Sequence, residues 1–263
     1  MSKGDFAKAT LNDFSTDALA AVSYAKSHQE LKNLPLGFIG HSEGALVACL
    51  AANKSSDVDF IVMLAGPGVP GKQLYLEQVE AIYRKSGYPE EKLSGKLRYL
   101  TLIMDRIQNT DVHVSIEATI LPYVTALADI DAQGKEQTKA LVDSYIRTFS
   151  LPSFRDTIKS EPQKILSNVK VPVLALSGEK DLQVIPETNL SGIERAINDS
   201  GGKVQTKLIP DLNHLFQHSH TGLPSEYLTN EETFAKDALS VMEQWISQVV
   251  SAELADTART PSR

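Results

Sequence analysis

Residues 40–44 read Gly-His-Ser-Glu-Gly and place Ser42 between two glycines. A serine hydroxyl can attack a carbonyl carbon when the backbone presents it at a sharp turn and a base removes its proton. The apolar run at residues 36–39 has the pattern of a buried strand, and the small-residue run at residues 45–52 has that of a helix. A G-x-S-x-G turn between a strand and a helix is a nucleophile elbow, in which glycines leave room because they have no Cβ. Ser42 is therefore the candidate nucleophile.

A serine nucleophile needs a histidine base and an acid that orients this base. Asp181 follows the apolar run at residues 171–176, and His214 follows a third such run at residues 204–209. Both runs have the pattern of buried strands. The carboxyl ends of parallel strands meet at one edge of an open α/β sheet, where ligands bind. We therefore expect Ser42, Asp181 and His214 to form a catalytic triad at that edge.

Other polar side chains near these positions offer alternatives. His218 and His220 share the loop with His214, but His214 is closest to the end of the strand and is favoured as the base. Asp211 is the alternative acid, although a carboxylate so close to the base in the same loop more often forms a turn. The three histidines lack the H-E-x-x-H pattern and the cysteine partners of common zinc sites, so no metal site is predicted. His41 is expected to pack beside the turn.

The β/α alternation of the sequence is interrupted once. Strand signals are present up to residue 65 and resume after Pro162, whereas residues 71–154 have apolar side chains at helical spacing. The last periodic segment, from Phe234, predicts an amphipathic helix, with Thr229 and Glu232 at the spacing of a capping box. The sequence thus predicts an α/β core divided by an inserted helical segment. The expected parts are residues 1–70 and 155–250 for the core, 71–154 for the insertion and 251–263 for a disordered tail.

Composition and charge exclude several classes of protein. The 263 residues are 42% hydrophobic and 22% charged, as in an ordinary globular protein with a buried core. A net charge of -7 argues against nucleic acid or an anionic membrane as partner, and nothing in the sequence indicates a cofactor. The single cysteine, Cys49, is expected to be buried as a packing residue. Residues 1–14 lack the pattern of a signal peptide, so a cytoplasmic protein is expected unless a further segment precedes Met1.

Five stretches of the sequence resemble one branch of a known superfamily. They are GDFAKATLNDFSTDALAAV from Gly4, IGHSEGALVA from Ile39, LAGPGVPG from Leu64, VPVLALSGEKDLQV from Val171 and LNHLFQHSHTGLPSEY from Leu212. These stretches resemble bacterial EstD-type acyl hydrolases, also described as serine aminopeptidase-like, of the α/β-hydrolase superfamily. The resemblance implies an α/β-hydrolase fold with a partial, mostly parallel sheet and with residues 71–154 as a helical cap. It also implies Ser42 as nucleophile, Asp181 as acid and His214 as base.

The resemblance further implies that part of the core sheet lies outside this sequence. The sequence aligns from a point after the loop that donates one of the two oxyanion-hole N–H groups, which leaves the N–H of Glu43 as the expected donor. The strand at residues 36–39, with Leu36 and Ile39 at its ends, is apolar on both faces, and residues 1–35 contain no strand signal to flank it. We therefore expect an exposed edge that self-associates or binds a partner chain, and an impaired activity of the chain alone.

The expected function is hydrolysis of a small-molecule carboxylic ester through an acyl-Ser42 intermediate. The alternative within enzymes is an aminopeptidase-like hydrolase of amides, for which Glu77, Glu80 or Asp105 could bind a free amine. The alternative outside enzymes is a non-catalytic interaction module that binds a partner through the exposed strand edge.

Overall fold

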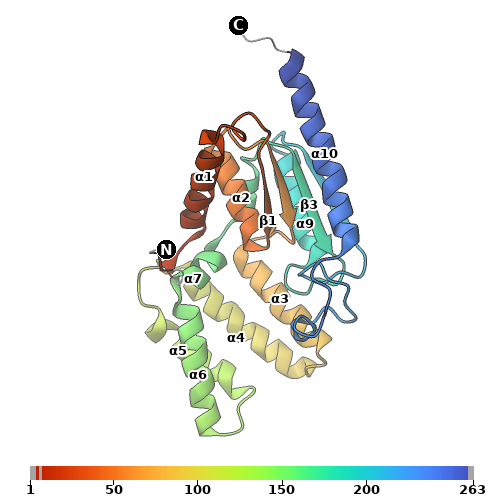
Figure 1. The fold of residues 1–263 in the computed structure, drawn as a ribbon. Coiled ribbons are helices and arrows are strands. Elements are labelled where there is room, and N and C mark those ends of the chain that lie inside the picture. Colours follow the sequence, from red (N-terminus) through yellow and green to blue (C-terminus); the bar gives the residue numbers. More distant parts are fainter. Residues whose placement is uncertain (1–3, 6–7, 260–263) are drawn as a thin grey trace. The chain divides into compact units, whose positions relative to one another are not determined.

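The computed structural model describes residues 4–5 and 8–259, which form two compact units. One unit contains the sheet and comprises Asn12–Val69 together with the described residues from Pro162 onward. The other unit is helical and comprises Pro70–Glu161 together with the described residues up to Leu11. Its N-terminal part is joined to it by a hydrogen bond from the Leu11 N–H to Asp156 Oδ2, 3.1 Å long. Figure 1 shows the elements of both units.

Within the described residues, the sheet consists of four parallel strands in the order β1-β2-β3-β4. They are β1 (Gly37–His41), β2 (Phe60–Leu64), β3 (Val173–Gly178) and β4 (Val204–Ile209). These positions confirm the strands predicted at the three apolar runs, and β2 lies within the strand signals that extend to residue 65. β2 and β3 are buried along their whole length, as expected for central strands of a parallel sheet, whereas β1 and β4 are partly exposed because they lie at the edges.

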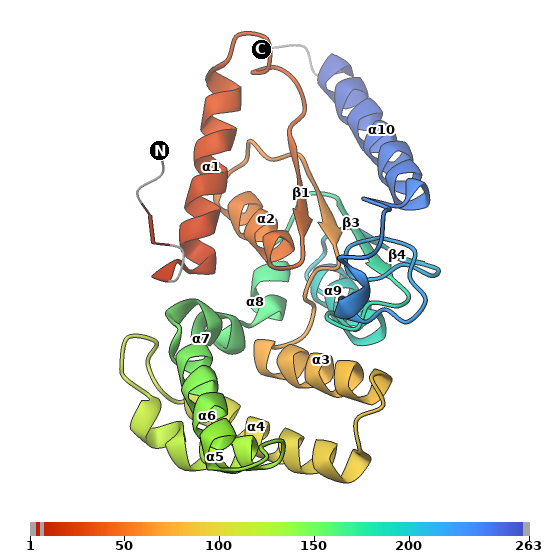
Figure 2. The same ribbon diagram turned by 60° about the horizontal axis from the view of Figure 1, so that its bottom comes forward.

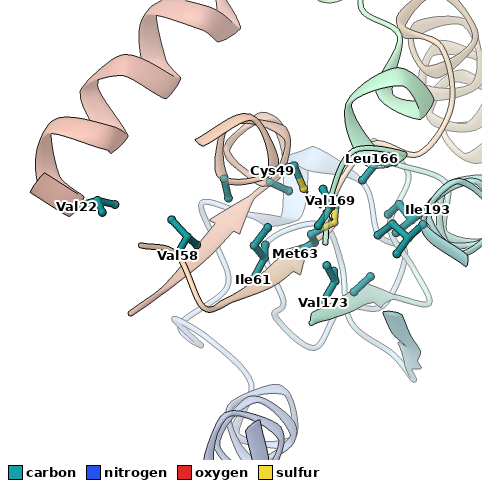
Figure 3. Packing of buried hydrophobic residues seen from close by; sticks show 13 residues of the cluster. Val22, Cys49, Val58, Ile61, Met63, Leu166, Val169, Val173 and Ile193 are labelled. Carbon is teal, nitrogen blue, oxygen red and sulfur yellow. Dashed lines mark hydrogen bonds between the residues drawn. The ribbon is translucent and has the colours of Figure 1, made fainter. Parts of the chain in front are cut away.

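Helices cover both faces of the sheet (Figures 1 and 2). One face is covered by α1 (Leu11–Ser27), α2 (Glu43–Lys54), α8 (Pro162–Leu166) and α9 (Pro186–Asn198), and the other by α10 (Lys236–Arg259). Figure 3 shows the first of these cores, in which Ile61, Met63 and Val173 of the strands lie among helical side chains that include Cys49 and Ile193. Burial of each such side chain contributes roughly 1.5–3 kcal/mol to stability. This packing keeps the carboxyl ends of the strands in place.

The helical unit contains α3 (Gly71–Lys85), α4 (Glu90–Gln108), α5 (Glu117–Asp129), α6 (Lys135–Ser150) and α7 (Pro152–Lys159). Among the residues described here, this unit has no strand, in line with the helical spacing of its apolar side chains. Its core includes a charged group, because the Lys96 side chain is only 2% exposed and forms an ion pair of 2.5 Å with Asp131. The Lys96 ammonium also lies 5.0 Å from the centre of the Tyr83 ring. The role of this unit as a cap remains a prediction.

The C-terminal helix differs from the sequence-based expectation at both ends. α10 begins at Lys236, so Thr229 and Glu232 do not cap it; the Glu232 carboxylate instead accepts a hydrogen bond of 2.6 Å from the His218 N–H. α10 also continues to Arg259, although a disordered tail was expected from Ser251. The segment Ser-Ala-Glu-Leu-Ala-Asp-Thr-Ala-Arg has enough strong helix formers to extend an existing helix. Residues 260–263 of the expected tail lie outside the described residues.

β1 has β2 as its one partner strand among the described residues, and its other edge is open. The Asp59 N–H donates to the Leu36 carbonyl and the Ser42 N–H donates to the Leu64 carbonyl, so these two ends of the segment face β2. Backbone groups alternate in direction along a strand, so the N–H and C=O of Ile39 point away from β2. The Ile39 side chain is 56% exposed. A partner at this edge remains a prediction.

No helix in the described part of the chain combines the length and the apolar character needed to cross a membrane.

Candidate active site

Ser42 lies at a strained turn between β1 and α2. Its backbone angles are φ 54° and ψ -122°, a region that residues other than glycine rarely adopt. The Ser42 N–H donates to the carbonyl of Leu64 at the end of β2, and its own carbonyl accepts from the N–H of Ala45 in α2. The turn is thus bonded to both neighbouring elements. These angles and bonds are those of a nucleophile elbow.

The two glycines of the motif are not equivalent. A Cβ atom on Gly40 would lie 2.2 Å from the carbonyl oxygen of Gly44, whereas a Cβ atom on Gly44 would meet nothing within 4 Å. Only Gly40 is therefore required by the close approach of the backbone. The expectation that both glycines clear space for the turn is wrong for Gly44, because the chain next to it is open on that side.

Asp181 and His214 form a buried pair. Asp181 follows β3, and its Oδ1 accepts hydrogen bonds from the backbone N–H groups of Gln183 (2.8 Å) and Val184 (2.9 Å). Its Oδ2 lies 2.9 Å from Nδ1 of His214, in the loop after β4. Asp181 is 1% exposed and His214 is 5% exposed. Because a carboxylate only accepts, His214 carries its proton on Nδ1, which leaves Nε2 as the atom that can take a proton.

The other polar candidates have different partners. Asp211 is exposed and has a positive φ of 62°; it forms an ion pair of 2.6 Å with Lys180, and this hydrogen bond lowers the pKa of Asp211. His218 is bonded to Glu232 at 3.0 Å, with half of its side chain exposed. His220 is exposed. The structure therefore brings His214 together with Asp181, and it brings neither His218, His220 nor Asp211 into this pair.

Ser42 is linked to the pair through its neighbour in sequence. The imidazole ring of His41 lies 4.7 Å from the ring of His214, and His41 Nε2 lies 2.8 Å from the backbone oxygen of His214. Among the described residues, Ser42 Oγ has no hydrogen-bond partner. Catalytic hydrogen bonds are often long or absent before substrate binds and tighten in the complex. His41 was expected to pack beside the turn, and its contacts are instead with the loop of His214. Sequence reasoning missed this contact, since nothing in the sequence indicates which loop His41 faces.

Glu43, whose N–H is the expected oxyanion donor, is the first residue of α2. The amino end of a helix carries a partial positive charge from the aligned peptide dipoles. A negative oxygen bound next to Ser42 would be stabilised by this end of α2.

Cys49 is buried in α2 and is no rival nucleophile. Burial raises the pKa of its thiol to about 12, so that the reactive thiolate does not form at neutral pH. Its sulfur lies 3.8 Å from the sulfur of Met63 in the core. In the part of the chain that the structure describes, no cluster of three or more histidine, cysteine or acidic side chains is arranged to hold a metal ion.

A parallel sheet with a serine at a strand–turn–helix elbow, and with an Asp–His pair at the carboxyl ends of later strands, is the arrangement of the α/β hydrolases. The α/β fold and the α/β-hydrolase superfamily, which the sequence motifs indicate, agree with this arrangement. Residues 128–250, slightly less than half of the chain, match the family model of the Dienelactone hydrolase family. The match includes Asp181 and His214 but not Ser42. This family match supports the conclusion that the protein is a hydrolase.

Several solved structures are similar to this one at low sequence identity. The proline iminopeptidase of Mycobacterium smegmatis is 15% identical, with a TM-score of 0.45, over 94% of this chain and 76% of that chain. The dienelactone hydrolase of Anabaena variabilis is 14% identical, with a TM-score of 0.38, over 83% and 57% of the two chains. An esterase of Pyrococcus furiosus is 18% identical, with a TM-score of 0.40, over 74% and 52%. A comparison with curated protein sequences finds no match.

Proposed function

We propose that this protein is a serine hydrolase that cleaves carboxylic esters through an acyl-Ser42 intermediate. The observation that carries the proposal is the combination of a strained Ser42 at the elbow with the buried Asp181–His214 pair beside it. His214 Nε2 accepts the proton of Ser42 Oγ as this oxygen attacks the ester carbonyl, and Asp181 stabilises the imidazolium that forms. The protonated His214 then returns the proton to the alcohol that leaves.

The acyl-enzyme is hydrolysed by the same groups in reverse roles. A water molecule gives a proton to His214 Nε2 and attacks the acyl carbon, and the proton then returns to Ser42 Oγ as the carboxylic acid departs. The negative oxygen of each tetrahedral intermediate is stabilised by the N–H of Glu43 at the amino end of α2.

Esters are favoured over amide substrates with a free amine. The acids that could bind such an amine are already paired with neighbours in the helical unit. Asp105 forms an ion pair with Lys72, and Glu80 forms an ion pair of 2.8 Å with Arg84. Glu77 accepts a hydrogen bond of 2.8 Å from Gln73. No observation in the described residues favours the aminopeptidase-like alternative.

A fluorophosphonate probe tests the proposal, because it reacts with an activated serine. The wild-type protein should be labelled at Ser42 and should hydrolyse a short nitrophenyl ester, while Ser42→Ala should do neither and should keep its circular dichroism spectrum. Ser177→Ala is a matched control, because Ser177 is a serine buried in β3; this variant should be labelled as the wild type is. Labelling of the Ser42→Ala variant at another residue would overturn the proposal.

A further inference from the structure

His41 forms a direct link between the elbow and the loop of the base. It is the last residue of β1, and its Nε2 lies 2.8 Å from the backbone oxygen of His214, which is far away in sequence. A carbonyl oxygen only accepts a hydrogen bond, so His41 Nε2 carries the proton and donates it. The ring of His41 also lies 4.7 Å from the ring of His214 and 6.4 Å from the ring of Phe216. The elbow therefore holds the backbone of the base itself.

The loop of the base is also bonded to other segments, because the Leu212 carbonyl accepts from the Lys180 N–H and the Phe216 carbonyl accepts from the Ala235 N–H, each at 2.8 Å. The side-chain oxygen of Asn213 accepts from the N–H groups of Leu215 (2.9 Å) and Gln217 (3.0 Å). Phe216, at a positive φ of 58°, donates its N–H to the Asn213 carbonyl. These bonds give the loop its turn and tie it to the end of β3 and to the segment before α10. The bond from His41 ties the loop directly to the elbow, because His41 and Ser42 are consecutive residues.

We infer that His41 is a positioning residue, which holds His214 at working distance from Ser42 by donating its Nε2–H to the His214 carbonyl. This inference rests on the proposed function. Asp181 fixes the rotation and tautomer of the His214 ring, while His41 fixes the backbone to which the ring is attached. A base that is displaced by about 1 Å loses on the order of 10²-fold in rate. The two anchors together leave the His214 imidazole little freedom to move.

The charge of His41 suits this position. Loss of water around the ring, although part of it stays exposed, lowers the pKa of His41; the titratable groups that act on it are His214 and Asp181. The lowered pKa favours the neutral form of the His41 ring at neutral pH. A second positive charge next to the His214 imidazolium would oppose its formation. A neutral donor holds the base without this penalty.

Two substitutions of His41 separate its donor function from simple packing. His41→Ala should lower kcat on a short nitrophenyl ester by about 10- to 100-fold, with KM little changed, because the base is displaced while substrate binding is not. His41→Gln should restore most of this loss, since its amide N–H reaches the same carbonyl. His28→Ala is the matched control, because His28 is an exposed histidine just after α1, and this variant should keep wild-type activity.

Nitrogen NMR of the imidazole rings distinguishes failure of this inference from failure of the proposed function, because it needs no activity. In the wild type, His41 should be the Nε2–H tautomer near neutral pH, and His41→Ala should shift the signals of the His214 ring. If the wild type is neither labelled nor active while these signals behave as stated, the proposed function fails and the positional link stands. Wild-type activity of His41→Ala, no recovery in His41→Gln, or an Nδ1–H tautomer of His41 would each overturn the inference.

Discussion

Replacement of Asp181 by asparagine is the sharpest test of the acid, because its hydrogen bonds determine how the new side chain lies. Oδ1 of Asp181 accepts from two backbone N–H groups, of Gln183 and Val184. An asparagine amide placed with its NH₂ toward these donors would leave both of them unpaired in a buried site, at roughly 1–3 kcal/mol each. The asparagine oxygen therefore stays on the backbone N–H groups, and the NH₂ group faces Nδ1 of His214.

This orientation reverses the tautomer of the base. An NH₂ group only donates, so His214 Nδ1 must accept and the ring proton moves to Nε2, which can no longer take the proton of Ser42. A loss of this kind costs about 10⁴-fold in kcat, or about 5.4 kcal/mol at 1.36 kcal/mol for each factor of ten. The fold should be retained, because the backbone bonds of residue 181 are kept.

The assay is hydrolysis of a nitrophenyl ester by Asp181→Asn and by Asp211→Asn, with thermal unfolding of both variants. Asp211→Asn is the matched control because it makes the same change on an exposed carboxylate whose partner is Lys180. An exposed ion pair contributes at most about 1 kcal/mol, so this variant should keep nearly all of its activity. Equal losses in the two variants, or a larger loss in Asp211→Asn, would refute the assignment of Asp181.

Three further predictions follow from other parts of the sheet unit. Gly40→Ala should destabilise the protein by roughly 1–3 kcal/mol in urea unfolding, because its Cβ would meet the Gly44 carbonyl. Gly44→Ala, in α2, should instead stabilise the protein by about 0.5–1 kcal/mol. Effects of the same sign in the two variants would contradict the elbow geometry. Hydrogen bonds from Ser219 and Thr221 lower the pKa of Glu226 from 4.5 to about 2, so its contribution to stability is complete above pH 4.5 and is lost as the pH falls toward 2. The wild type should thus lose its stability advantage over Glu226→Gln across this range, and an advantage that does not change with pH would disprove the role of Glu226. At the open edge of β1, Ile39→Lys should reduce self-association measured by analytical ultracentrifugation, and a wild-type chain that stays monomeric at high concentration would argue against a partner at this edge.

The strands and the elbow were predictable because their signals are local. The apolar runs before Ser42 and Asp181 predict buried strands, and a glycine–serine turn between strand and helix predicts the elbow. These features depend on neighbouring residues and on backbone sterics, so a short stretch of sequence is enough to predict them. The end of α10 shows the limit of this approach, since Ser251 and the residues after it lack apolar periodicity but still extend a helix that is already formed.

The partners of the polar side chains were decided by the tertiary structure. The sequence favoured Asp181 over Asp211 and His214 over His218, but the pairing of β3 with β4 is what brings Asp181 and His214 to 2.9 Å. The contact of His41 with the backbone of His214 depends on the same packing of distant segments and has no local signal. Hydrogen bonds act only over about 3 Å, so which groups form them is settled by strand register and loop packing rather than by residue type. The sequence by itself therefore determined the chemistry available to this protein, and the packed sheet decided which residues can carry it out together.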